Sequence, residues 1–279
     1  MNDVHTIPVG RLAPKDQWDQ NMLDQLFANR MYHTGCEFSR HEGYPKADGC
    51  ILIIPGRYWF KRCNEISESL SRYQWVLAIR TGDEEDLFYP DRVVHPNIRW
   101  WVQSPRPGRD YDGARLFGVG WPAHFNTLPN AFRNIPVFLS AQNTHPARNE
   151  CFDALTDIEG RIVATDGFTR GIPREEYVAN MCAAKIAPAP SGPVTADNFR
   201  LFEALQAHTV PIADTKEFWN MLFDPAFPIV DKYAQLPGYI KDQLRLWPAN
   251  TNRITAWWMH TKRQYTRWLL DDLTELGAL

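Results

Sequence analysis

Apolar and polar positions change in short blocks along the chain, and the spacing within each block predicts a helix or a strand. The apolar positions of residues 15–30 recur at helical spacing, at Trp18, Met22, Leu23, Leu26 and Phe27. Residues 50–55, "CILIIP", form a short apolar run that is typical of a buried strand. The polar segment between these two, residues 31–49, is predicted to be a loop.

The alternation of helices and strands continues to the end of the chain. In the first half it predicts a helix over 64–73 and strands over 75–80 and 98–103. In the second half the predicted strands cover 137–142, 185–190 and 209–214, and the predicted helices cover 147–158, 175–184, 195–208 and 253–276. Strands that alternate with helices pair in parallel, so the pattern predicts an α/β fold.

Proline and glycine cluster in residues 104–136, which places a domain boundary at about residues 125–135. We therefore expect two Rossmann-like domains, residues 1–130 and 131–252, with an amphipathic helix in residues 253–279 that packs across both. Ligands of such folds bind beyond the carboxyl ends of the strands. The expected site is accordingly a cleft that the two domains face.

Composition narrows the class of protein. The 279 residues carry a formal net charge of −3, whereas dedicated nucleic-acid binders are usually basic. Five cysteines without a C-x-x-C spacing indicate reduced thiols rather than a disulfide framework. Because we find no signal-peptide core and no apolar run that could span a bilayer, we expect a cytoplasmic protein without a membrane partner, in the host cytoplasm if it is viral. The oligomeric state is left open.

Residues 185–214 combine a loop of small residues with a helix that carries a charged pair. The loop "PSGP" precedes the helix, Thr195 and Asp197 are suitable N-cap residues, and Arg200 lies three positions before Glu203. Helix N-terminal amides bind anions, and a carboxylate further along can accept both hydroxyls of a ribose. The stretch therefore suits a nucleoside diphosphate. An ordinary strand–loop–helix with a surface Arg–Glu pair is the alternative, since "PSGP" is not a known phosphate-binding motif.

The same stretch resembles the donor-binding segment of exostosin-like glycosyltransferases, which have the GT-B fold. The motifs that carry the resemblance occur in the family's order: "PSG" at 190–192, "DNFR" at 197–200, "EAL" at 203–205 and "VPI" at 210–212. Upstream, residues 138–155 and 165–190 resemble the family's arginine-bearing helix and its Glu-Tyr helix. The match covers roughly residues 135–215, and the first half resembles the family only in architecture.

The resemblance implies a GT-B-like enzyme that moves a sugar from a nucleoside diphosphate sugar, with UDP as the preferred nucleotide, to a hydroxyl group. It places Glu203 on the ribose hydroxyls and Arg148 on the diphosphate, and Arg200 either orients Glu203 or contacts phosphate. Ser191 stands where the family often has arginine, so one phosphate contact is either missing or supplied by Arg148. The remaining donor-binding candidates are Gln142, Thr144, Lys185, Ser191, Gly192 and Asp197.

Inverting transfer, which the resemblance favours, needs a base that takes a proton from the acceptor. Asp83 is preferred, because "GDEED" follows the strand at 75–80; Glu84 and Glu85 adjoin it, and a helix cap is the alternative role for this acidic run. Glu37, His33 and His41 in the polar segment are rivals. We expect transfer without a metal, in which arginine and a helix dipole replace the cation. A zinc site is an alternative for His33, Cys36, His41 and Cys50, but the spacing of these residues in the sequence does not match that of a known zinc finger.

The acceptor is not identified by any motif. One hypothesis is a hydroxymethylated pyrimidine in DNA, as in phage DNA modification, with a flipped base held by Trp59, Trp100 or Trp121. Arg106 and Arg109 in "SPRPGR" would then contact the phosphate backbone. Two other classes remain open: a non-catalytic nucleotide- or glycan-binding protein on the same fold, and a nucleotide-sugar epimerase.

Overall fold

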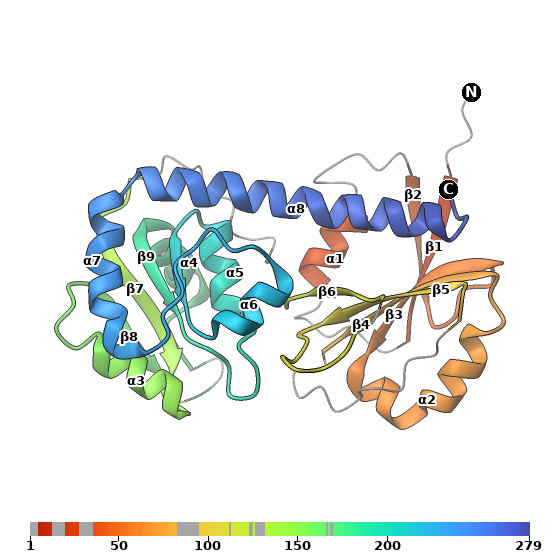
Figure 1. Ribbon diagram of the computed structural model, residues 1–279, viewed down its shortest axis with the longest axis horizontal. Helices are drawn as coiled ribbons and strands as arrows, with labels where there is room; N and C mark the ends of the chain where they lie inside the picture. The colour runs from red at the N-terminus through yellow and green to blue at the C-terminus, as the bar shows by residue number, and fades with distance from the viewer. Residues whose placement is uncertain are drawn as a thin grey trace. The chain divides into compact units, whose positions relative to one another are not determined.

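The computed structural model describes residues 5–12, 20–27, 36–82, 95–111, 113–122, 125, 132–165, 167 and 170–279. The chain divides into two compact units (Figure 1). Unit 1 comprises Met1–Gly120 and Lys262–Leu279, and unit 2 comprises Trp121–Thr261. Each unit is built on its own sheet, of six strands in unit 1 and four in unit 2, and every strand pair is parallel. Parallel sheets with helices between the strands confirm the α/β class.

The sheet of unit 1 has the strand order β2-β1-β3-β4-β5-β6. Its strands are β1 (His5–Arg11), β2 (Cys36–Glu42), β3 (Gly49–Pro55), β4 (Trp75–Thr81), β5 (Ile98–Gln103) and β6 (Arg115–Phe117). Its helices are α1 (Gln20–Phe27), α2 (Gly56–Leu70) and the last part of α8 (Ala249–Glu275). The chain leaves β1 for β2 on one side and later returns to β3 on the other, so β1 and β3 flank the topological switch point.

Two adjacent tryptophans on β5 lie on opposite faces of the sheet of unit 1. Successive strand residues face opposite sides of a sheet. Trp100 faces α2, where its ring meets that of Trp59 at 5.3 Å between centroids. Trp101 faces α8, and its indole Nε1 donates to the carboxylate of Asp272 at 2.7 Å. Both tryptophans are buried, so the sheet is covered on both faces.

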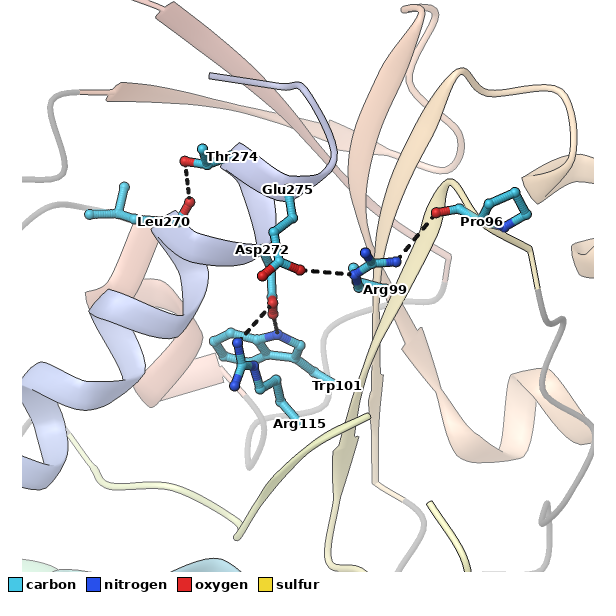
Figure 2. Close-up of polar contacts among 8 residues, drawn as sticks. All are labelled: Pro96, Arg99, Trp101, Arg115, Leu270, Asp272, Thr274 and Glu275. Atoms are coloured by element: carbon cyan, nitrogen blue, oxygen red, sulfur yellow. Dashed lines mark hydrogen bonds and ion pairs between the residues drawn. The ribbon is translucent and has the colours of Figure 1, made fainter. Parts of the chain in front are cut away.

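Asp272 ties α8 to this sheet (Figure 2). Its side chain is buried, and besides Trp101 it accepts a hydrogen bond from Arg115 of β6 at 3.2 Å. The Arg115 guanidinium also lies over the ring of Trp268, 5.5 Å from its centroid. At the end of the helix, Glu275 and Arg99 form a second contact at 3.4 Å, which is exposed. The buried contact, rather than the exposed one, is expected to contribute most to stability.

Replacement of Asp272 by alanine is expected to lower the free energy of unfolding by about 2 kcal/mol, because the buried Trp101 N–H loses its acceptor. Urea unfolding measures this loss. Asp271, the exposed neighbouring residue, supplies the matched control, and Asp271→Ala should change stability by less than about 0.5 kcal/mol. Equal effects of the two substitutions would show that the buried contact contributes nothing specific.

Unit 2 repeats the topology of unit 1 with fewer strands, in the order β10-β9-β7-β8. Its strands are β7 (Ile135–Gln142), β8 (Arg161–Thr165), β9 (Ala184–Ala189) and β10 (Val210–Ala213). Its helices are α3 (Pro146–Ala154), α4 (Arg174–Ala183), α5 (Phe199–Gln206), α6 (Lys216–Leu222), η1 (Tyr233–Gln235), α7 (Leu236–Leu246) and the first part of α8. Helices α4 and α5 pack together on one face, and α3, η1 and α7 pack together on the other (Figure 1).

Aromatic rings fill the core of unit 2 beside α5. Trp258 of α8 is fully buried, and its ring packs against Trp121 at 5.3 Å and Phe202 at 5.9 Å between centroids. Its indole Nε1 donates to Gln206 Oε1 at 3.0 Å. The first part of α8 is therefore an integral element of unit 2.

Arg133 stabilises unit 2 at the end of its sheet where strands β9 and β10 begin. The side chain is buried, and it donates to the backbone carbonyls of Ala184 at 2.5 Å and Ala207 at 2.6 Å and to the hydroxyl of Thr209 at 2.8 Å. The Thr209 hydroxyl in turn donates to the Met181 carbonyl at 2.7 Å. Carbonyls at the ends of α4 and α5 are thus satisfied by one guanidinium.

Most predicted elements are present, and one prediction is wrong. The segment 31–49 is not a loop throughout, because it contains β2, a polar strand that among the described strands pairs with β1 alone. Helix α2 begins at Gly56 with Pro55 as its N-cap, but its backbone leaves the helical conformation at Arg62, and the part after this break matches the helix predicted over 64–73. The stretch 104–136, rich in proline and glycine, contains β6, and the two units divide within it after Gly120.

Among the helices of the described residues, none combines the length and the apolarity that crossing a membrane requires.

Candidate functional site

The predicted donor-binding residues of unit 2 gather where strands β7 and β9 end. The connection after β7 leads to β8 on one side of the sheet, and the connection after β9 leads to β10 on the other. Neighbouring parallel strands whose connections diverge in this way leave a crevice at their carboxyl ends, and ligands of α/β proteins bind there. This switch point is the candidate site.

Three predicted residues lie on the β7 side of the switch point. Gln142 is the last residue of β7 and is partly buried, and Thr144 is exposed in the loop that follows. Arg148 lies in the first turn of α3 and is partly buried. These three residues therefore all lie between the last residue of β7 and the first turn of α3.

On the β9 side, the loop beginning at Ser191 is fixed to the end of β10. Ser191 Oγ donates to Asp214 Oδ1 at 2.5 Å, and the Ser191 N–H donates to Asp214 Oδ2 at 3.3 Å. Tyr233 of η1 donates to the same Oδ2 at 2.6 Å. Asp214 is itself buried, so its carboxylate is satisfied inside the protein.

This arrangement changes the expected role of Ser191. Both of its donors are directed at Asp214, and a phosphate beside that carboxylate would be repelled by its charge. Gly192 is favoured on steric grounds, because a Cβ at this position would lie 3.0 Å from the Thr195 carbonyl oxygen, which is closer than most Cβ contacts. Anion contacts are therefore better placed on the β7 side than at Ser191.

The start of α5 differs from the predicted one. The N-cap is Asn198, whose side chain accepts from the Leu201 N–H at 3.0 Å, and the helix begins at Phe199. Neither Thr195 nor Asp197 caps this helix, because Thr195 Oγ1 instead accepts the Asp197 N–H at 2.9 Å in the preceding turn. Asp197 is buried at this turn.

Arg200 and Glu203 are partly buried, and each is bound to a different element. Arg200 donates through Nε and Nη2 to the Ser140 carbonyl of β7, at 3.1 and 2.8 Å. Glu203 Oε2 accepts a hydrogen bond of 2.5 Å from the Tyr177 hydroxyl of α4. The pair is therefore part of the packed interior beside β7, not a solvated pair on the helix surface.

Burial is the leading electrostatic influence on Glu203. It raises the pKa of this carboxyl above its ordinary value of 4.5, and the Tyr177 hydrogen bond and the charges of Arg200 and Arg174 offset only part of the effect. Burial likewise raises the pKa of Tyr177, with the Glu203 charge adding to it. A carboxylate held in this way, at a switch point, is typical of a functional position.

His145, Asp214 and Tyr233 also belong to the site but were not predicted from the sequence. His145 is the N-cap residue of α3, and its pKa is lowered by burial and by the charge of Arg148. It therefore favours the neutral imidazole. The sequence does contain a signal for Asp214, because an acidic residue directly follows the apolar strand β10. Tyr233 had none, since its partner is 19 residues away.

Lys185 is not brought to the site. It lies at the start of β9, six residues and about 20 Å of extended chain from Ser191. Its Nζ lies over the ring of Trp247, 4.9 Å from the centroid. It lines a shallow hollow at the amino end of the sheet together with Asp157, Glu159 and Lys241.

The candidates in unit 1 are only partly described. Asp83, Glu84, Glu85 and His33 lie outside the described residues, while Glu37 and His41 are exposed on β2, the edge strand. The described segment that precedes Asp83 ends at Gly82, whose N–H donates to Gln103 Oε1 at 2.6 Å. Within the described residues, no three His, Cys, Asp or Glu side chains are close enough to hold a metal ion.

The aromatic residues considered for base stacking are core residues. Trp59, Trp100 and Trp121 are all buried, at 2%, 7% and 1% exposure. The hypothesis that they hold a flipped base is therefore wrong for the structure described, because their rings pack against other tryptophans. Arg106 and Arg109 are partly exposed in the loop between β5 and β6.

Comparison with known proteins leaves the family of the chain undetermined. No family model matches it, and no curated protein matches it. Among solved structures, the crystal structure of Anabaena Alr3699/HepE in complex with UDP and glucose is similar over 98% of this chain and 97% of that chain, with 9% identity and a TM-score of 0.43. A TM-score below 0.5 establishes neither a shared fold nor a shared function. The function is therefore inferred from the geometry of unit 2.

Proposed function

We propose that this chain is a glycosyltransferase of the GT-B type that binds a nucleoside diphosphate sugar in unit 2 and transfers the sugar to a hydroxyl group. UDP is the nucleotide we expect. The observation that carries the proposal is Glu203, a partly buried carboxylate beside the switch point of a parallel sheet, held by Tyr177 and flanked by Arg200. Burying a carboxylate costs stability, so its retention there is best explained by a ligand.

The ribose is assigned to Glu203, because an ionised carboxylate accepts hydrogen bonds and a ribose offers two hydroxyl donors. Arg200 supports this role indirectly. Its two hydrogen bonds to the Ser140 carbonyl fix α5 against β7, and its positive charge lies close enough to Glu203 to lower the carboxyl pKa. The nucleoside therefore lies over α5 in this proposal.

The diphosphate is assigned to the β7 side of the switch point. Arg148, in the first turn of α3, supplies a guanidinium that can bind phosphate oxygens in bidentate geometry. Gln142 and Thr144 add neutral donors from the same connection. Asp214 holds the Ser191 donors, so the loop after β9 shapes the site rather than binding the anion.

Transfer then proceeds by one displacement at the anomeric carbon. The acceptor oxygen forms the new bond to this carbon, the bond to the diphosphate oxygen breaks, and the nucleoside diphosphate leaves with both electrons of that bond. A carboxylate of unit 1 takes the acceptor proton; Asp83 is preferred, with Glu84 and Glu37 as alternatives. Arg148 stabilises the charge that develops on the leaving diphosphate, so the proposal includes no metal.

The acceptor is proposed only as a hydroxyl-bearing molecule. A hydroxymethylated pyrimidine in DNA stays among the acceptors to be tested, on the grounds of Arg106 and Arg109 alone. The burial of Trp59, Trp100 and Trp121 removes the stacking argument for it.

A thermal-shift panel of UDP, GDP, ADP, CMP and TDP tests the proposal on the wild type and on Glu203→Ala. At a concentration of about 100 times Kd, one nucleoside diphosphate should raise the Tm of the wild type by about 5–10 °C. The shift should disappear in Glu203→Ala and persist in Glu217→Ala, which replaces an exposed glutamate of α6.

Absence of a shift with every nucleotide would overturn the proposal. A shift without release of the nucleoside diphosphate from its sugar, in the presence of an acceptor panel that includes hydroxymethylated DNA, would instead identify a binding protein without transferase activity.

A further inference from the structure

The hydroxyl of Tyr177 restricts how Glu203 can meet a ligand. It donates to Oε2 over 2.5 Å, a distance typical of a strong bond between a hydroxyl and a carboxylate. A carboxylate in this bond cannot rotate freely about its last torsion. As a residue Glu203 is only partly buried, and among the described residues its carboxylate is engaged through Oε2 alone, so Oε1 is the oxygen left for a ligand.

The position of the Tyr177 hydroxyl is itself fixed by aromatic packing. The ring lies 5.5 Å from that of Phe138 on β7 and 6.4 Å from that of Phe125, both at steep angles. Phe138 and Phe125 are buried. The hydroxyl is therefore held by the core of unit 2, independently of any ligand, and it transmits a fixed position to the carboxylate.

We propose that Tyr177 is a positioning residue that makes the nucleotide site selective for ribonucleotides over 2′-deoxyribonucleotides. With Oε2 engaged by Tyr177, Oε1 is left to accept the hydroxyl donors of the sugar ring, and a 2′-deoxyribose offers one donor fewer than a ribose. The inference rests on the proposed function, since it presupposes that Glu203 meets a ribose.

Substitution by phenylalanine removes the hydroxyl and keeps the ring packing, so Tyr177→Phe is expected to fold. Without the hydrogen bond, Glu203 samples several orientations and the gain from binding a ribose hydroxyl falls. Binding of a 2′-deoxynucleotide, which offers one hydroxyl donor fewer to Glu203, should change less. A purely structural role for Tyr177 would weaken both ligands by the same factor.

The experiment measures Kd for the diphosphate identified by the panel, UDP being the expected one, and for its 2′-deoxy form. The wild type should prefer the ribonucleotide by about 30-fold, as expected for loss of a hydrogen bond to a charged group. Tyr177→Phe should weaken the ribonucleotide about 10-fold and the deoxynucleotide by less than about 2-fold. Tyr239→Phe on α7, outside the site, is the matched control and should match the wild type.

The possible failures are distinct. A wild type that binds neither form overturns the proposed function and this inference with it. A wild type that is selective, together with a Tyr177→Phe variant of equal selectivity, overturns this inference and leaves the proposed function intact. A wild type that binds both forms equally well also overturns the inference.

Discussion

Replacement of Arg133 by alanine is expected to lower the free energy of unfolding of unit 2 by about 3 kcal/mol. The guanidinium donates to two backbone carbonyls and one hydroxyl in a buried environment, and alanine leaves all three acceptors without this donor. Burial also lowers the pKa of Arg133, so removal of the charge recovers part of the loss. The net effect remains destabilising because three acceptors are affected at once.

Urea unfolding followed by tryptophan fluorescence measures this effect, since the core of unit 2 contains Trp121, Trp219 and Trp258. Phe132, the preceding residue, provides a matched control because its side chain is 85% exposed. Phe132→Ala should change the free energy of unfolding by less than about 0.5 kcal/mol. If Arg133→Ala proves as stable as the wild type, the three hydrogen bonds contribute nothing net, and desolvation of the charge cancels them.

Arg133 also shows what the sequence could not predict. It lies in the stretch rich in proline and glycine where the domain boundary was predicted, and its partners are 51, 74 and 76 residues further along the chain. Hydrophobic periodicity records which local element a residue belongs to. It contains no information on which distant carbonyls a long polar side chain reaches.

Strands whose two faces are both buried were predictable. Every residue of β3 and of β10 is buried, so each is a continuous apolar run in the sequence. The edge strands β2 and β8 are mostly polar or partly exposed, and β6 has only three residues. Strands of this kind lack the apolar run, and β2 was accordingly assigned to a loop.

The order of the elements around the candidate site was predictable, but the contacts of its side chains were not. The pattern predicted a strand, a small-residue loop and a helix that carries Arg200 and Glu203, and the structure has β9, a loop and α5 in this order. The pairing between Arg200 and Glu203 was not the main contact, because Arg200 bonds to Ser140 and Glu203 to Tyr177. Likewise, the Ser191 donors bind Asp214, a contact that the sequence did not predict. Each of these contacts links elements that are separate in the sequence.

Replacement of Glu203 by glutamine is expected to weaken binding of the nucleoside diphosphate about 50-fold, because the ribose hydroxyls lose a charged acceptor. The same substitution should leave the protein at least as stable as the wild type at neutral pH. Glutamine keeps an oxygen that accepts the Tyr177 hydroxyl, and it removes a charge whose burial is unfavourable. Opposite effects on stability and binding are expected of a residue retained for function.

The difference in the free energy of unfolding between the wild type and Glu203→Gln should depend on pH, and the pKa of Glu203 determines the direction. Because burial raises the pKa of Glu203 above 4.5, the folded protein binds this proton more tightly than the unfolded chain does. Stability of the wild type therefore falls as the pH rises from about 4.5 through the raised pKa of the folded state, and glutamine abolishes this dependence. Denaturation of both proteins across this range measures the difference, which should be smallest at the acidic end.

Glu217→Gln, at an exposed position, should show no such trend. A Glu203→Gln variant that is less stable than the wild type at neutral pH would mean that the carboxylate stabilises the fold, and the functional explanation for its burial would lose its basis.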